Sequence, residues 1–144
     1  MATTQTFDSA DRISDSAAGL TASPSRQAFQ ILRFAYTVAP VVAGLDKFFN
    51  LLVDWDQYLP SVATRLLGSH VHTFMQGVGV IEIVAGIGVA LRPRLFSYVV
   101  AGWLAGIILN LLAIPGYYDV ALRDLGLALG ALALARLSVQ HSER

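Results

Sequence analysis

The sequence contains no cysteine, and this absence removes several kinds of chemistry at once. Disulfide bonds, thiolate-held iron–sulfur clusters and thiol–disulfide relays all need cysteine side chains. A redox role would therefore depend on a bound cofactor or on a partner protein.

Charged residues are also scarce, at 14% of the 144 residues, and the formal net charge is zero. The chain has no run of lysine and arginine, whereas nucleic-acid-binding proteins carry such residues as a patch or stripe. The sequence therefore predicts no nucleic-acid partner.

Common catalytic motifs are missing too, since the chain has no nucleophile elbow, no phosphate-binding glycine loop and no HExxH motif. His70 and His72, with Asp54 and Asp56 nearby, are the candidate metal ligands. Two histidines separated by one residue do not share a helix face, so polar residues at a membrane surface explain them better. The sequence predicts no metal site and no catalytic activity of the chain on its own.

Long apolar stretches are what the chain has in abundance. Apolar residues make up 55% of it, and the mean hydropathy is +0.58. Residues 95–118 carry no charge and reach the length of about 20 apolar residues that a membrane-spanning helix needs. Three further stretches are long enough but are interrupted by charges. We expect an all-α integral membrane four-helix bundle, with spans at about residues 29–52, 69–91, 95–114 and 120–139.

The bundle would occupy residues 28–139. Polar composition predicts a flexible N-terminal tail at residues 1–27, and a short C-terminal tail follows at residues 140–144. A soluble helical protein with an apolar core is the alternative, because buried helices are also apolar all round.

The positions of lysine and arginine predict the orientation, since cytoplasmic loops hold more of them. With the turn Arg92-Pro93-Arg94 in the cytoplasm, both termini are cytoplasmic as well. The basic residues on that side are Arg12, Arg26, Arg33, Arg92, Arg94, Arg136 and Arg144, against Lys47, Arg65 and Arg123 in the other half. An outer connection from about residue 53 to residue 68 would hold Trp55 and Tyr58 as interfacial aromatics.

Pairs of glycines recur at helical spacing in three of the expected spans. Small residues allow membrane helices to approach closely, so such pairs predict packing faces. The pairs are Gly79 with Gly86, Gly102 with Gly106, and Gly126 with Gly130.

Polar side chains inside the expected spans form the candidate site: Asp46, Lys47, Gln76, Glu82, Asn110, Arg123 and Asp124. A charge at the centre of a membrane helix costs roughly 2.5 to 3.5 kcal/mol, so it should face a partner or a cavity. With a rise of about 1.5 Å per residue, all of these residues except Glu82 reach one level in the outer half of the membrane. Glu82 would lie alone below them, near the midplane.

Glu82 has more than one interpretation. It could pair with Lys47 or Arg123, or stay protonated because burial disfavours the charged carboxylate. In the structural interpretation, the charges satisfy one another and fix the register of the helices. In the functional interpretation, Glu82 relays a proton or contacts a quinone head group. The balanced set of both signs favours the structural interpretation.

Several of these stretches together resemble the DoxX family of small four-helix membrane proteins, over about residues 31–137. The matching pieces are Gly44-Leu45-Asp46-Lys47-Phe48, Gly79-Val80-Ile81-Glu82 leading to Gly86, the Arg92-Pro93-Arg94 turn, and the stretch from Asp119 to Gly126. The family name comes from a subunit of an archaeal thiosulfate:quinone oxidoreductase, and some bacterial relatives are linked to membrane redox complexes that handle oxidative stress. The resemblance implies a multi-pass protein of the prokaryotic plasma membrane, with quinone as the cofactor to consider.

The resemblance and the polar set favour an accessory or anchor subunit of a quinone-linked membrane redox system. Its partners would be the lipid bilayer and other membrane subunits, or further copies of this chain. One alternative is a small proton-coupled transporter or carrier in which Glu82, Lys47 and Arg123 line an intramembrane polar cavity. Another is a structural subunit of a larger membrane complex, joined through the glycine faces.

Overall fold

The computed structural model describes residues 23–142, and this part of the chain is helical throughout, without a β-strand. The elements in chain order, with η for a 3-10 helix, are α2 (Pro24–Phe49), η1 (Trp55–Tyr58), α3 (Ser61–Leu67), η2 (Gly68–His70), α4 (Val71–Leu91), α5 (Pro93–Leu112) and α6 (Tyr118–Ser142). The all-α prediction is confirmed. The connection expected at residues 53–68 contains two short helices, η1 and α3.

The helix ends follow local signals and differ from the expected boundaries by a few residues. α2 begins at Pro24, because the Ser23 hydroxyl accepts a hydrogen bond from the Arg26 N–H and proline suits a first turn. Residues 24–27 of the predicted tail are therefore helical, and residues 1–22 lie outside the described part. α6 continues to Ser142, well into the predicted C-terminal tail.

Backbone turns follow α2 and α5 directly. Asn50 follows α2 in the left-handed conformation (φ 49°), and its N–H donates to the carbonyl of Asp46 at 2.6 Å. Beyond α5, Pro115 and Gly116 form a tight turn in which Gly116 has φ 98°, a conformation that glycine adopts without steric cost.

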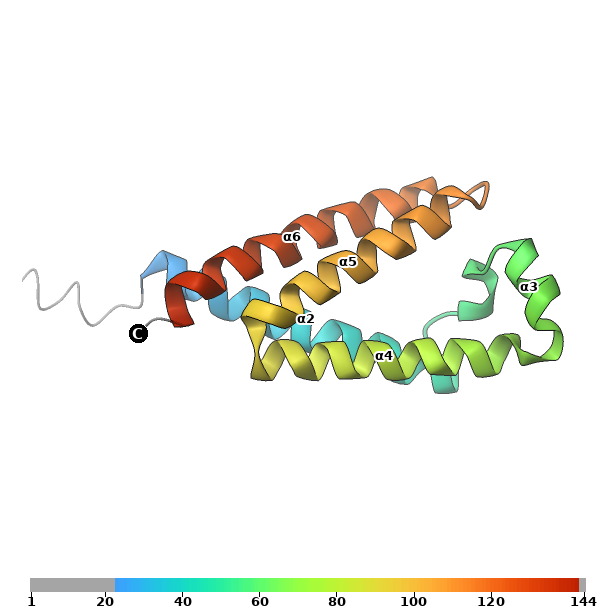
Figure 1. Ribbon diagram of the computed structural model, residues 1–144, viewed down its shortest axis with the longest axis horizontal. Coiled ribbons are helices and arrows are strands. Elements are labelled where there is room, and N and C mark those ends of the chain that lie inside the picture. Colours follow the sequence, from blue (N-terminus) through green and yellow to red (C-terminus); the bar gives the residue numbers. More distant parts are fainter. Residues whose placement is uncertain (1–22, 143–144) are drawn as a thin grey trace, which may run out of the picture.

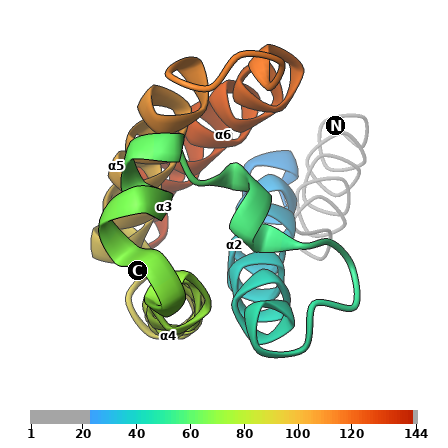
Figure 2. The same ribbon diagram turned by 90° about the vertical axis from the view of Figure 1, so that its right-hand side faces the viewer.

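The four long helices pack as two antiparallel pairs, α2 with α4 and α5 with α6 (Figure 1). The two pairs meet at one end, called here the narrow end, and diverge toward the other, the wide end. The view onto the wide end shows η1 and α3 lying across it (Figure 2). Polar side chains from both pairs therefore reach η1, as described below.

The apolar core lies in the half of the molecule near the narrow end. Its buried residues are Tyr36, Ala85, Val89, Val100, Ala101, Ala131 and Leu134, which come from all four long helices. The Tyr36 hydroxyl also donates to the Leu127 carbonyl, which joins α2 to α6. The ring of Phe29 stacks on His141 at 5.0 Å, so the first turns of α2 lie beside the last turns of α6. Both ends of the described chain thus lie at the narrow end.

Three helices of the described part are long and apolar enough to cross a membrane: Pro24–Phe49, Ser61–Leu91 and Pro93–Leu112. α6, with 25 residues, is also long enough, but it carries Asp119, Arg123, Asp124 and Arg136 and does not combine the high hydropathy and low charge of these three helices. Large apolar side chains are exposed on every long helix, for example Phe34, Ile87, Leu109 and Leu122. An apolar exterior of this extent is expected where lipid, rather than water, surrounds the protein.

Candidate functional site

The candidate site begins with a close contact between the backbones of α2 and α4. A Cβ atom added to Gly44 would lie 2.5 Å from the Gly79 carbonyl oxygen, and one added to Gly79 would lie 2.5 Å from the Gly44 oxygen. Two helical turns further along α4, a Cβ atom added to Gly86 would lie 2.7 Å from the Thr37 carbonyl oxygen. The packing face predicted from Gly79 and Gly86 is confirmed, and Gly44 supplies its counterpart on α2.

Lys47 and Glu82 each follow one of these glycines by three residues. Because α2 and α4 are antiparallel, Lys47 and Glu82 lie on opposite sides of the glycine contact. Their backbone positions are therefore about 9 Å apart along the helix axis. Side chains lean toward the N-terminus of their own helix, so Lys47 and Glu82 lean toward each other and close this offset. Lys47 Nζ lies 2.6 Å from Glu82 Oε2, with the two side chains only 3% and 11% exposed. The result is a buried ion pair joining α2 to α4.

Trp55 of η1 covers this ion pair. Lys47 Nζ lies 3.6 Å from the centre of a Trp55 ring, which is the geometry of a cation–π interaction. The indole Nε1–H of Trp55 donates to Asp46 Oδ2 at 2.8 Å. Trp55 thus contacts both members of the Asp46-Lys47 pair of residues.

The Asp46 carboxylate also fixes the chain where it leaves α2. It accepts hydrogen bonds from the backbone N–H groups of Leu51 and Leu52, at 2.9 and 3.0 Å to Oδ1. With the Trp55 bond, three donors satisfy this buried carboxylate. Asp46 therefore positions η1 over the ion pair without needing a ligand.

Gln76 and Asn110 do not reach the ion pair. Gln76 Nε2 lies 3.3 Å from His72 Nε2, one turn away on α4. Asn110 Nδ2 donates to the Tyr58 carbonyl at 2.9 Å, which joins α5 to η1. Gln76 thus contacts its own helix, and Asn110 fixes η1 against α5 at the wide end.

Arg123 and Asp124 lie on different sides of α6. Arg123 is 74% exposed and pairs with Asp119, one turn earlier, at 3.2 Å. Asp124 is half-buried and lies within electrostatic range of Glu82. No hydrogen bond or ion pair of Asp124 occurs among the described residues. The structure thus brings Asp46, Lys47 and Glu82 together, with Asp124 in electrostatic range of Glu82 and Arg123 paired with Asp119.

Trp55 is the member of the site that the sequence interpretation missed. Its sequence signal is that of an interfacial aromatic, and nothing local links it to Asp46 nine residues earlier. A weak sequence signal for this contact exists. An indole N–H that leaves water needs an acceptor, and Asp46 is the nearest carboxylate inside an expected membrane span.

The candidate metal ligands His70 and His72 lie at the end of η2 and in the first turn of α4. Among the described residues there is no group of three histidine, aspartate or glutamate side chains able to hold a metal ion. His72 Nδ1 lies 3.8 Å from Asp56 Oδ2 at a partly exposed position.

The other glycine pairs have different surroundings. A Cβ added to Gly102, Gly106 or Gly126 would meet nothing within 4 Å, whereas one at Gly130 would collide with the Tyr36 hydroxyl. Gly130 therefore packs against α2, while the face of α5 with Gly102 and Gly106 is open.

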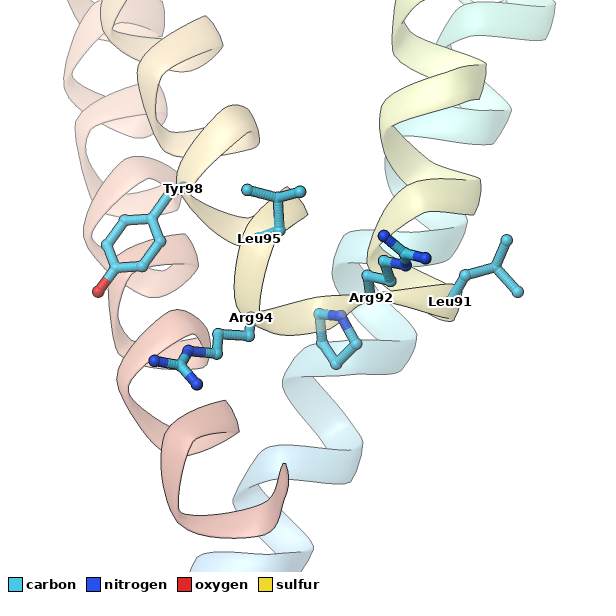
Figure 3. Close-up of a pocket in the computed structure, with 6 residues that line it drawn as sticks. Leu91, Arg92, Arg94, Leu95 and Tyr98 are labelled. Atoms are coloured by element: carbon cyan, nitrogen blue, oxygen red, sulfur yellow. The ribbon is translucent and has the colours of Figure 1, made fainter. Parts of the chain in front are cut away.

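Chemically, the site is a closed set of charges. Lys47 has a carboxylate and an aromatic ring as partners, Glu82 has Lys47, and Asp46 has three donors. A surface depression exists at the α4–α5 turn, but its lining residues belong to the narrow end, away from the ion pair (Figure 3).

Comparison of the chain with protein-family models, curated proteins and solved structures finds no match. The resemblance to the DoxX family stays a prediction from sequence.

Proposed function

We propose that this chain is a DoxX-like accessory or anchor subunit of a quinone-linked redox system in the prokaryotic plasma membrane. The observation that supports this role is the closed pairing of Lys47 with Glu82. A group that exchanges protons or holds a substrate needs access, but these side chains are buried and covered by Trp55. Such a pair serves helix packing, and the redox chemistry falls to a partner.

The open face of α5 supports the role of a subunit. Gly102 and Gly106 are exposed and four residues apart, which is the spacing that lets a second membrane helix approach closely. We place the contact with a partner subunit, or with another copy of this chain, on this face. The link to quinone rests on the family resemblance.

The proposed topology has four spans and both termini in the cytoplasm. Both ends of the described chain lie at the narrow end, as an even number of spans requires. In this topology α6 is the fourth span, and its uncharged stretch at residues 125–135 lies in the bilayer core.

Purification of the tagged full chain in mild detergent tests the proposal. Mass spectrometry of the eluate should identify membrane redox subunits, and solvent extraction should recover quinone. Gly106→Leu should reduce recovery of the partner by blocking close helix approach. Gly77→Leu is the matched control, because Gly77 is also open but lies on α4. A chain recovered alone and without quinone would contradict the proposal.

A proton-coupled carrier is the second candidate, and Asp124 is the observation that favours it. This half-buried carboxylate lies in electrostatic range of Glu82 and has no hydrogen-bond partner among the described residues. In proteoliposomes with an internal pH dye, a carrier would take up protons and Asp124→Asn would abolish the uptake. Uptake no faster than in empty liposomes leaves the subunit role.

A further inference from the structure

The turn between α4 and α5 forms a shallow hollow at the narrow end. Its volume is about 520 Å³, and the lining residues are Leu91, Arg92, Pro93, Arg94, Leu95 and Tyr98 (Figure 3). The hollow is remote from the ion pair and takes no part in the proposed subunit role.

Both arginines of the hollow lack a partner among residues 23–142. Neither the Arg92 nor the Arg94 guanidinium forms a hydrogen bond or ion pair within the described part of the chain. By contrast, Arg33 donates to the Ala90 carbonyl, and Arg123 pairs with Asp119. Arg92 and Arg94 extend to opposite sides of the turn, so the hollow between them is flanked by two free guanidinium groups (Figure 3).

The distribution of charges in the described part of the chain favours an anion at this place. The described arginines at the narrow end are Arg26, Arg33, Arg92, Arg94 and Arg136. The described carboxylates all lie farther toward the wide end, at Asp46, Asp54, Asp56, Glu82, Asp119 and Asp124. Along α4, the nearest of them is Glu82, about 15 Å from Arg92. No negative side chain of the described part therefore competes for the two arginines.

Apolar side chains in the same hollow decide what kind of anion fits. Leu91 and Leu95 are exposed large hydrophobic residues, and Tyr98 is exposed one turn after Arg94. An inorganic phosphate would use only the guanidinium groups, whereas a phospholipid would also lay its acyl chain along the leucines. Basic pockets beside membrane helices bind anionic lipid head groups in this way.

We propose that the α4–α5 turn is a binding site for an anionic phospholipid. Arg92 and Arg94 attract the anionic head group from the two sides of the turn, and Leu91, Leu95 and Tyr98 contact the upper acyl chain. The site depends on insertion of the bundle in a bilayer with the narrow end at its surface, and it is independent of any redox partner.

Native mass spectrometry of the delipidated full chain in neutral detergent tests this site. The chain is titrated with phosphatidylglycerol or with phosphatidylcholine of the same acyl chains. Each basic residue near an anionic lipid contributes about fivefold in affinity, so the double variant Arg92→Gln with Arg94→Gln should bind phosphatidylglycerol about 30-fold more weakly. Arg65→Gln removes an exposed arginine at the wide end and should bind as the natural chain does.

Three outcomes would overturn the proposal. Equal affinity for the two lipids would show that charge does not select the ligand. An unchanged affinity of the double variant, or an equal loss in Arg65→Gln, would place the binding elsewhere. Full displacement of phosphatidylglycerol by millimolar inorganic phosphate would assign the hollow to free phosphate instead. Circular dichroism of each variant establishes that it is folded.

Discussion

Replacing Glu82 with glutamine preserves the size of the side chain but leaves Lys47 as a buried charge without its counter-ion. The two groups are 2.6 Å apart, and Lys47 is only 3% exposed. At that distance and an effective dielectric constant of about 20, their Coulomb attraction is about 6 kcal/mol before desolvation is subtracted. Removal of one partner from a buried pair costs about 3 to 5 kcal/mol. Since the Trp55 ring still contacts Lys47, we expect Glu82→Gln to lower the free energy of unfolding by about 3 kcal/mol.

The double variant separates the pair from its surroundings. Replacing a buried ion pair by apolar residues of similar volume is often neutral, because no charge is left without a partner. Lys47→Met combined with Glu82→Met should therefore recover most of the stability lost in each single variant. The coupling energy between the two positions should be about 2 to 3 kcal/mol.

Titration of the purified chain from mild detergent into dodecyl sulfate, followed by circular dichroism, measures these free energies. Arg123→Gln is the control, because it breaks an exposed pair with Asp119 and should change stability by less than about 0.5 kcal/mol. If Glu82→Gln is as mild as this control, the buried pair does not form. If the double variant loses the sum of the two single losses, the two side chains are independent and the packing argument fails.

Two further changes test the neighbours of the pair with the same titration. Gly79→Ala places a Cβ 2.5 Å from the Gly44 oxygen, so it should destabilise the chain by about 1 to 3 kcal/mol, while Gly77→Ala at an open position should not; equal stability of the two variants would contradict the close contact. Trp55→Phe retains a ring over the ammonium group but removes the 2.8 Å hydrogen bond to Asp46, which should cost about 1.5 to 3 kcal/mol; a variant as stable as the natural chain would show that Asp46 does not need this donor.

The parts of the site that sequence could predict are those that depend on one helix at a time. The four long helices follow from apolar stretches, and the packing face of α4 follows from Gly79 and Gly86. Each of these signals is complete within about two dozen residues of the chain. The same kind of signal identified Asp46, Lys47, Glu82 and Asp124 as site residues, but it missed Trp55 and could not say which side chains would meet.

The partner of Glu82 could not be chosen from sequence because the estimate used backbone heights alone. Those heights place Lys47 in an outer layer and Glu82 below it, yet the two side chains are in contact. In an antiparallel pair, both side chains lean toward each other, and the long Lys47 side chain covers most of the offset. The contact between Gly44 and Gly79 sets the register that makes this geometry possible, and it is a tertiary fact.

The orientation of α6 was equally beyond the sequence, and it changes what the polar set can do. Arg123 and Asp124 are adjacent, so a helix that turns one inward turns the other away by about 100°. The structure turns Asp124 inward and leaves Arg123 with Asp119. The interior near the ion pair therefore holds one cation, Lys47, beside three carboxylates, of which Asp46 is satisfied by its three donors and Glu82 by Lys47. With Arg123 turned away, no ion pair among the described residues joins α6 to α4. The two helix pairs therefore meet through the apolar core at the narrow end, and they diverge beyond it (Figure 1).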